Sequence, residues 1–297
     1  MQSSQQSRNL SDTLTQNRLS VDTQTFEVTP VGLIFRPSPA SQIEPRLGVE
    51  KMIDTNLLTL NIGSSVDLFS WKTTNGKEGV NSESELRLGA DMFTWTQIRS
   101  EGDFRFPVED VDYLFGLNMT WRYKYQNSNL PEDIFMPVEY SIRIRLAHIS
   151  AHTVDGQYDN YTQKFIFQQP YTYSKEFIDA LYSYQNYWHH AVGYRLFAGA
   201  MLLVHVIPTT LTAFAPHYGF VLSGAPATLT PYLAYDGRVE KVTAWQGDNS
   251  LQLGVKLGKW DEGGMSLYAG YYQGKNVHGE LYFLNTTQFS IGTNFSF

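Results

Sequence analysis

An alternation of apolar and polar residues with a period of two dominates the chain after Pro45. From Phe115 to Tyr123, for example, every second residue is large and apolar, and Gly, Asn, Thr and Arg lie between them. Successive side chains of a β-strand point to opposite faces, so this pattern predicts strands with one apolar face. Twelve such runs occur, at 46–53, 56–70, 84–96, 111–125, 138–152, 176–184, 191–206, 216–223, 228–238, 249–259, 265–274 and 287–297.

The polar faces of these strands indicate which kind of β protein the chain forms. A soluble sandwich turns its apolar faces inward and leaves its polar faces in water. Here the polar positions are rich in glycine and include arginines, and aromatic residues such as Tyr113 and Trp121 lie near strand ends, as in the girdles of a membrane barrel. We therefore predict an all-β fold, a transmembrane antiparallel up-and-down β-barrel of about twelve strands.

The links between the predicted strands give a second indication of topology. Periplasmic turns of such barrels are short and extracellular loops are longer. The short links 185–190, 223–227 and 260–264 follow even-numbered strands, and the longer links 97–110, 153–175, 239–248 and 275–286 follow odd-numbered strands. The link 126–137 is an exception, because it is long where a short turn is expected.

The two ends of the chain differ in character. Residues 1–30 are rich in Gln, Ser, Thr and Asn and show no sustained strand pattern, so we predict a polar N-terminal arm in the periplasm, either disordered or with a short helix, and a barrel domain at 31–297. The last strand alternates up to Phe297, a terminus that resembles the signal read by the barrel-assembly machinery. We expect that machinery to be a partner during biogenesis.

Composition narrows the class and the location. Apolar residues make up 42% of the chain and the mean hydropathy is -0.29. No run of about 18 apolar residues occurs, but strands of about 9–11 alternating residues can cross a bilayer at low mean hydropathy. No leader pattern follows Met1, and we predict a mature protein of the bacterial outer membrane whose signal peptide has been removed. The net charge of -7 argues against a nucleic-acid partner.

Three segments resemble a known family. They are Ile34–Pro37 with Glu44–Arg46, the run Arg143–His152, and the segment Tyr271–Gly279. Together they are similar to an uncharacterised bacterial family catalogued as domain of unknown function 1207, from about residue 30 to the end. The resemblance implies an outer-membrane barrel of Gram-negative bacteria and no settled activity. Ala151 replaces the second serine of the family's His-x-Ser-Ser-His run, so no role of that serine carries over.

A pair of polar residues in the run 138–152 is a candidate catalytic site. His148 and Ser150 have the parity of Ile144 and Leu146, so they continue the lipid-facing row, where uncompensated polar groups are costly. The His-x-Ser arrangement resembles outer-membrane phospholipase A and the lipid A deacylase barrels, which implies Ser150 as nucleophile and His148 as general base. Asn160 and Glu176 are candidates for the residue that orients the histidine. The alternative is that these residues lie in water at the headgroup boundary.

The inward positions carry charges of both signs. We predict that they form ion pairs that fill the lumen; the alternative is a narrow solute channel. The main lumen charges are Arg87, Asp91, Arg122, Arg143, Arg145, Arg195 and Lys256.

Three functions follow from these patterns. They are a non-catalytic scaffold or partner-binding barrel with the N-terminal arm as a contact, a lipid esterase using Ser150 and His148, and a narrow channel. Outer-membrane lipid and lipopolysaccharide are the expected surroundings, and no cofactor or metal site is expected. The scaffold is favoured, because the sequence assembles neither a complete triad nor an open lumen.

Overall fold

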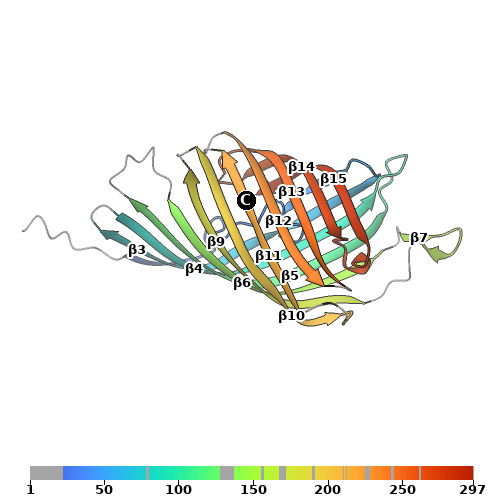
Figure 1. Ribbon diagram of the computed structural model, residues 1–297, viewed down its shortest axis with the longest axis horizontal. Coiled ribbons are helices and arrows are strands. Elements are labelled where there is room, and N and C mark those ends of the chain that lie inside the picture. Colours follow the sequence, from blue (N-terminus) through green and yellow to red (C-terminus); the bar gives the residue numbers. More distant parts are fainter. Residues whose placement is uncertain are drawn as a thin grey trace, which may run out of the picture.

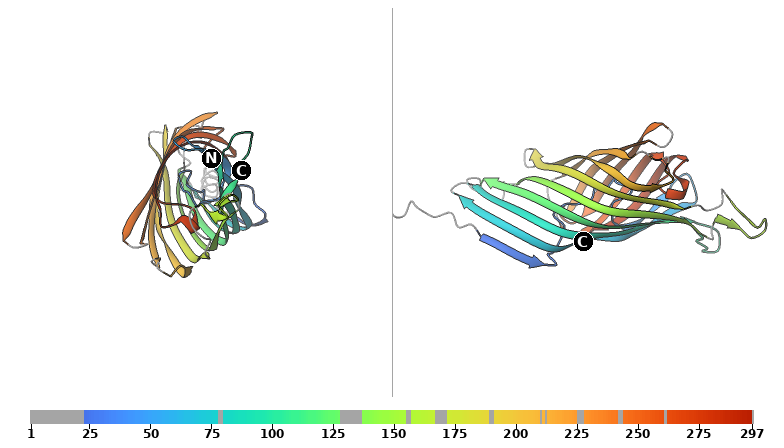
Figure 2. Two further views of the ribbon diagram at one scale, coloured as in Figure 1. Left: turned by 90° about the vertical axis from the view of Figure 1, so that its right-hand side faces the viewer. Right: turned by 90° about the horizontal axis from the view of Figure 1, so that it is seen from below.

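The chain folds into a single closed barrel (Figures 1 and 2). The computed structural model describes residues 23–77, 80–127, 137–154, 157–166, 172–188, 191–209, 211, 213–224, 228–241, 244–260 and 262–296. Most of the predicted arm, the centre of the long link 126–137 and Phe297 lie outside the described residues.

Twelve antiparallel strands form the barrel wall, which confirms the predicted fold class. Each strand pairs with its neighbours along the chain, and the last strand pairs with the first to close the ring. The strands are β2 (Leu47–Met52), β3 (Leu57–Lys77), β4 (Val80–Arg99), β5 (Val108–Asn127), β6 (Val138–Thr153), β9 (Tyr173–Trp188), β10 (Val192–Ile207), β11 (Phe214–Gly224), β12 (Leu229–Lys241), β13 (Trp245–Leu257), β14 (Gly264–Lys275) and β15 (Asn285–Ser296).

Among the described residues, four short elements lie outside the wall. β1 (Thr23–Val28) pairs with the far half of β3, β7 (Tyr158–Asp159) and β8 (Lys164–Phe165) form a small hairpin, and η2 (Gly279–Leu281) is a 3-10 turn. β1 corrects the expectation that residues 1–30 contain no strand. Both of its faces are exposed, so its sequence carries no buried apolar parity that would have revealed it.

Several strands are longer than the alternation predicts. β3, β4 and β5 have 21, 20 and 20 residues, whereas β14 and β15 have 12 each, so one side of the barrel is taller (Figure 1). The backbone pairing continues past the positions where the apolar face ends. For the same reason the link predicted at 239–248 is only 242–244, because β12 and β13 extend into it.

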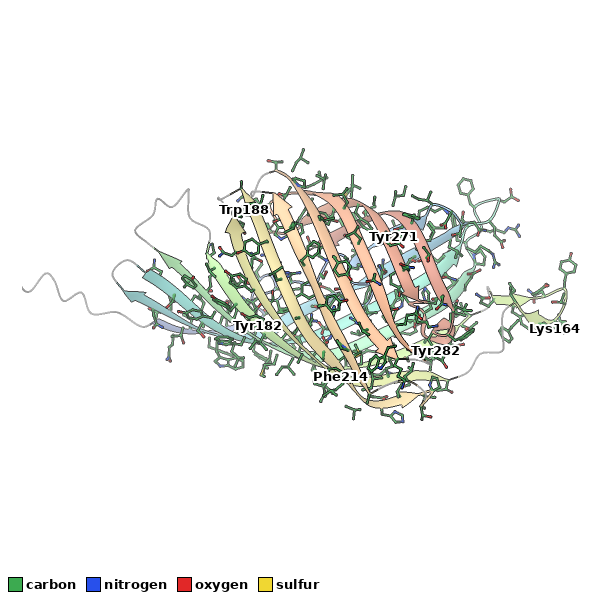
Figure 3. The ribbon with its side chains drawn as sticks, in the orientation of Figure 1. Lys164, Tyr182, Trp188, Phe214, Tyr271 and Tyr282 are labelled. Carbon is green, nitrogen blue, oxygen red and sulfur yellow. The ribbon has the colours of Figure 1, made fainter. Side chains whose placement is uncertain are left out.

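The outer surface of the barrel is apolar. On β5, Leu117 is 65% exposed, and on β13 Leu253 is 62% exposed. Figure 3 marks Tyr182, Trp188 and Phe214 among the exposed aromatic side chains. A soluble monomer rarely exposes so large an apolar area, whereas a barrel in lipid must do so. Within the described ranges, no helix has the length and hydrophobicity needed to cross a bilayer.

The two ends of the barrel differ in the length of the connections between strands, which gives them the names short-turn end and long-loop end. At the short-turn end, 189–191, 225–228 and 258–263 join neighbouring strands, and β15 ends there. At the long-loop end, the links include 100–107, 154–172 and 276–284.

Candidate functional site

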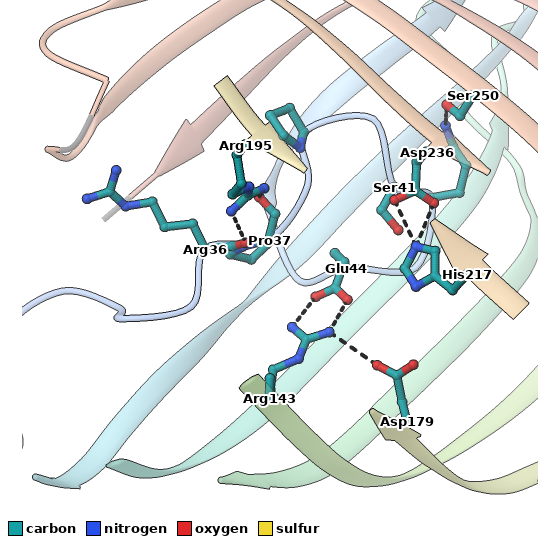
Figure 4. Close-up of polar contacts among 12 residues, drawn as sticks. Arg36, Pro37, Ser41, Glu44, Arg143, Asp179, Arg195, His217, Asp236 and Ser250 are labelled. Atoms are coloured by element: carbon teal, nitrogen blue, oxygen red, sulfur yellow. Dashed lines mark hydrogen bonds and ion pairs between the residues drawn. The ribbon is translucent and has the colours of Figure 1, made fainter. Parts of the chain in front are cut away.

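A segment of the chain itself occupies the barrel interior. Residues 29–46, between β1 and β2, pass through the lumen, and we call them the lumenal segment (Figure 4). Ile34, Phe35, Ala40, Ser41 and Glu44 of this segment are all buried. The place of this segment inside the barrel is not apparent from the sequence, because the segment has neither strand nor helix periodicity.

Glu44 anchors the lumenal segment to the wall. Its carboxylate accepts two hydrogen bonds from Arg143, at 2.8 and 2.5 Å, and two from Arg145, at 3.4 and 3.1 Å. Asp179 lies 3.2 Å from both arginines, and Asp91 lies 3.9 Å from Arg145. Burial alone would raise the pKa of Glu44, but the two guanidinium groups outweigh it and hold that pKa well below its usual range.

The remaining predicted lumen charges also face inward. Arg87 pairs with Glu85 at 2.6 Å and with Asp67 at 3.0 Å, and Arg122 pairs with Glu85 at 2.7 Å. Arg195 instead donates to the backbone carbonyls of residues 36 and 37, at 2.7 and 3.3 Å. Internal ion pairs therefore do fill much of the interior, together with the lumenal segment.

A loop fills the lumen at the long-loop end. Gly279, Glu280 and Leu281 of η2 are buried, and the indole nitrogen of Trp95 donates to the carbonyl of Val277 at 3.1 Å. His278 Nδ1 lies 2.6 Å from the carboxylate of Asp112. The lumenal segment and this loop thus occupy the lumen at two heights along the barrel axis, which argues against an open channel.

A polar cluster lies on the opposite, outward face near the long-loop end. His148 of β6, Glu176 of β9 and His205 of β10 are directly paired across three neighbouring strands. His148 Nδ1 lies 2.8 Å from Glu176 Oε1, and His205 Nδ1 lies 2.6 Å from Glu176 Oε2. Ser174 donates to Glu176 Oε1 at 3.1 Å. One carboxylate therefore binds two imidazoles and a hydroxyl.

The nucleophile candidate lies beside this cluster. Ser150 follows His148 by two positions on the same face of β6 and is paired with Ser174 across the strands. Same-face neighbours on a strand are about 6.7 Å apart along the strand, within reach of side chains that lean toward each other. With Nδ1 of His148 bound to Glu176, its Nε2 is free to take a proton from a serine, as in a Ser-His-acid triad.

A β-bulge brings the second histidine to the cluster. The register of β10 against β9 shifts between Leu203 and His205, so Val204 has no partner. Without this register shift, His205, two positions after Leu203, would share the inward parity of Leu203. Bulges re-aim side chains and are frequent beside active sites. His205 cannot be assigned to this face from the sequence, because only a register shift gives it the parity of Glu176.

Apolar side chains flank the cluster on both sides. Phe115, paired with His148, is 47% exposed, and Val204 and Phe214 are 67% and 45% exposed. Along β6, the path from Tyr140 to His148 is about 27 Å, or about 21 Å in height at a tilt of about 40°. With Tyr140 in the row of tyrosines at the short-turn end, that height places the cluster near the upper edge of an apolar band of about 25 Å. The cluster is a polar island in a surface suited to lipid.

Comparisons with known proteins find distant structural matches. No protein-family profile and no curated protein matches the chain. The transport unit of the autotransporter AIDA-I from Escherichia coli is 10% identical, with a TM-score of 0.32, over 86% of this chain and 92% of that chain. OmpT, an outer membrane protein of Vibrio cholerae, is 10% identical, with a TM-score of 0.33, over 92% and 99%. The translocator domain of the autotransporter NalP from Neisseria meningitidis is 11% identical, with a TM-score of 0.20, over 98% and 95%.

These scores are too low to carry an argument about function. The strand pairing itself defines the class, a closed twelve-stranded β-barrel with an apolar outer surface.

Proposed function

We propose that this chain is a bacterial outer-membrane β-barrel that hydrolyses acyl ester bonds of membrane lipids on its outer surface. Ser150 is the nucleophile, His148 the general base, and Glu176 the residue that orients the histidine. The observation that carries the proposal is the 2.8 Å contact between Glu176 and Nδ1 of His148, which lies two residues before Ser150 on the same face of β6.

The outer-membrane location rests on the surface chemistry. The barrel has an even number of strands and an apolar exterior, as bacterial outer-membrane barrels do. The resemblance to the domain of unknown function 1207 family supports the same location and a Gram-negative source. The short-turn end would then face the periplasm and the long-loop end the exterior.

The outward position of the cluster favours catalysis over a structural role. An ion pair whose members are 41% and 37% exposed in water contributes little to stability, and at a lipid surface it carries a desolvation cost. A lipid substrate, by contrast, approaches from that surface. Its ester bonds lie near the headgroups, the level at which this polar island faces outward.

The reaction would follow the general route of acyl transfer. His148 Nε2 accepts the hydroxyl proton of Ser150 as Oγ attacks the ester carbonyl carbon, and the protonated imidazole then returns that proton to the leaving alcohol. Water, deprotonated by the same imidazole, cleaves the acyl-serine to a fatty acid and regenerates Ser150. The carboxylate of Glu176 fixes the tautomer of His148 and stabilises its charged form throughout.

Hydrolysis of lipid tests this proposal. Purified protein in phospholipid vesicles, or mixed with lipopolysaccharide, should release fatty acid, and Ser150→Ala should abolish the release. Ser174→Ala is the matched control and should retain most activity, because it removes the other hydroxyl of the cluster and leaves both imidazoles bound to Glu176. Loss of activity in Ser174→Ala with full activity in Ser150→Ala would contradict the assignment.

A non-catalytic scaffold is the second candidate function. The filled lumen favours this candidate, because it gives no path for a solute. The exposed β1 on the tall side of the barrel favours it as well, because its outer edge can pair with a strand of a partner. If wild-type protein released no fatty acid from either lipid, this candidate would replace the esterase. Deleting residues 1–28 should then abolish binding to any partner that the full-length chain retains.

A further inference from the structure

A cavity of about 570 Å³ lies between the lumenal segment and the wall at the short-turn end. It is lined by residues 31–34, 36–39 and 44–46 of the segment and by residues of β3, β4, β5, β10 and β12 to β15. Ligand pockets have volumes of about 300–1,000 Å³ and often lie in the mouths of β-barrels. The size and place of this cavity therefore fit a small-molecule ligand.

The charged residues that line the cavity are mostly cations. They are Arg36, Arg46, Arg87, Arg122, Arg195 and Lys256, against the carboxylates Glu44 and Glu262. Both carboxylates are bound elsewhere, Glu44 by Arg143 and Arg145 and Glu262 by Lys259. Arg87 and Arg122 are themselves paired with Asp67 and Glu85, but the lining still holds more cations than carboxylates. We call it the cationic cavity.

Arg46 and Arg195 carry this excess most clearly. Within the described part of the chain, neither has a carboxylate within ion-pair distance. Arg46 donates to the carbonyls of Pro39 and Ser41 and to the side chain of Gln42, and its Nε is buried without a partner. Arg195 donates to the two carbonyls of residues 36 and 37, its only hydrogen-bond acceptors among the residues that the structure describes. A guanidinium has five N–H donors, so each retains donors for another acceptor.

Aromatic side chains form a further part of the lining. Tyr232 and Trp260 lie with their ring centroids 5.2 Å apart, and the ammonium of Lys256 lies 5.8 Å from the ring of Trp260. Such a wall adds apolar surface beside the cations, which suits an organic anion better than a bare inorganic ion.

We infer that the cationic cavity binds a small soluble anion that carries phosphate or carboxylate groups. The oxyanion contacts Arg46 and Arg195, and the body of the ligand lies against Trp260. Since the cavity lies inside the mouth of the barrel and the catalytic cluster lies on its outer face, this site is separate from the proposed esterase. A soluble anion is favoured over a lipid headgroup, because the lining comes from the lumenal segment and inward-facing strand positions.

Calorimetric titration of the detergent-solubilised barrel tests the inference. The probes are inorganic pyrophosphate, citrate and, as a lipid-borne phosphate, dihexanoyl phosphatidylglycerol below its micellar concentration. Pyrophosphate or citrate should bind, and raising NaCl from about 50 to about 500 mM should weaken binding, because salt screens charge. Binding of the lipid alone, or of none of the three, would overturn the inference.

Variants locate the site. Arg46→Gln and Arg195→Gln should each weaken binding at least tenfold, with Arg195→Lys affected less. Because both arginines also hold the lumenal segment, Ser266→Glu provides a second measurement. It adds a carboxylate to the cavity wall without removing any arginine contact, and it should also weaken binding at least tenfold. Lys164→Gln, in the exposed β8, is the control, and equal affinities in all variants would contradict the location.

Discussion

Two substitutions at the anchor of the lumenal segment, Glu44→Gln and Arg143→Gln, each remove one charge but should lower the free energy of unfolding by different amounts. Around the anchor, the two cations Arg143 and Arg145 face the three carboxylates Glu44, Asp179 and Asp91. Glu44→Gln leaves two charges of each sign, whereas Arg143→Gln leaves three carboxylates around one guanidinium. Arg143→Gln should therefore lower the free energy of unfolding more than Glu44→Gln does, although each substitution removes one partner of the same ion pair.

The contacts give the magnitude. Glu44→Gln weakens hydrogen bonds to two guanidinium groups, each worth about 1.5–3 kcal/mol at most, and the amide replaces part of them. We expect a loss of about 1–3 kcal/mol in the free energy of unfolding. Arg143→Gln leaves the carboxylates of Glu44 and Asp179 without one of their cations. Because these two side chains are only 3% and 1% exposed, the substitution should cost about 3–5 kcal/mol in the free energy of unfolding.

Denaturant unfolding in detergent, followed by tryptophan fluorescence, measures both values. A carboxyl group with a depressed pKa stabilises the fold above its unfolded pKa, and that contribution is lost as the pH falls through the folded value. The cost of Glu44→Gln should therefore be complete at neutral pH and decrease progressively as the pH falls below about 4.3, the unfolded pKa of a glutamate. A cost for Glu44→Gln equal to or above that for Arg143→Gln would refute the charge balance described here.

Further predictions concern the cluster, the long-loop end and the lumen. Glu176→Gln should lower the rate of fatty-acid release by about 10²- to 10⁴-fold with a smaller change in KM, and His205→Gln should lower it less; equal rates in Glu176→Gln and wild type would remove Glu176 from the triad. Burial would lower the pKa of His278, but its contact with Asp112 and the nearby acidic groups raise it, so its stabilisation is complete below about pH 6.5 and is lost as the pH rises through the raised value. The melting temperature should fall over that range in wild type and not in His278→Gln, and parallel pH profiles would contradict this. In planar bilayers, wild-type protein should show no conductance and deletion of residues 31–44 should produce it; open channels in wild type would mean that the lumenal segment does not block the barrel.

The sequence was most informative where one face of the chain meets lipid. Every barrel strand was predicted, because the outward positions repeat apolar side chains at a period of two. The strand ends were underestimated, since pairing continues where that contrast has ended, as in β3 and β4. β1 was missed because neither of its faces is buried.

The local sequence pattern predicts less about the lumen and about the outward-facing cluster of His148, Glu176 and His205. The inward charges could be assigned from parity, but the partner of Arg143 and Arg145 is Glu44, about 100 positions away in an irregular segment. Glu176 could be proposed only as a neighbour of His148 along the chain, and its contact depends on the register between β6 and β9. His205 could not be assigned, because a single bulge residue decides which face it occupies.

Covalent labelling of Ser150 tests the central claim most directly. A fluorophosphonate with an alkyl chain reacts with serines that a histidine activates, and mass spectrometry identifies the modified residue. We predict an adduct on Ser150 in the wild-type barrel in lipid, a much slower reaction in His148→Ala and Glu176→Gln, and normal labelling in Ser174→Ala. An unmodified Ser150, or equal labelling in wild type and His148→Ala, would contradict a catalytic role for the outward-facing cluster.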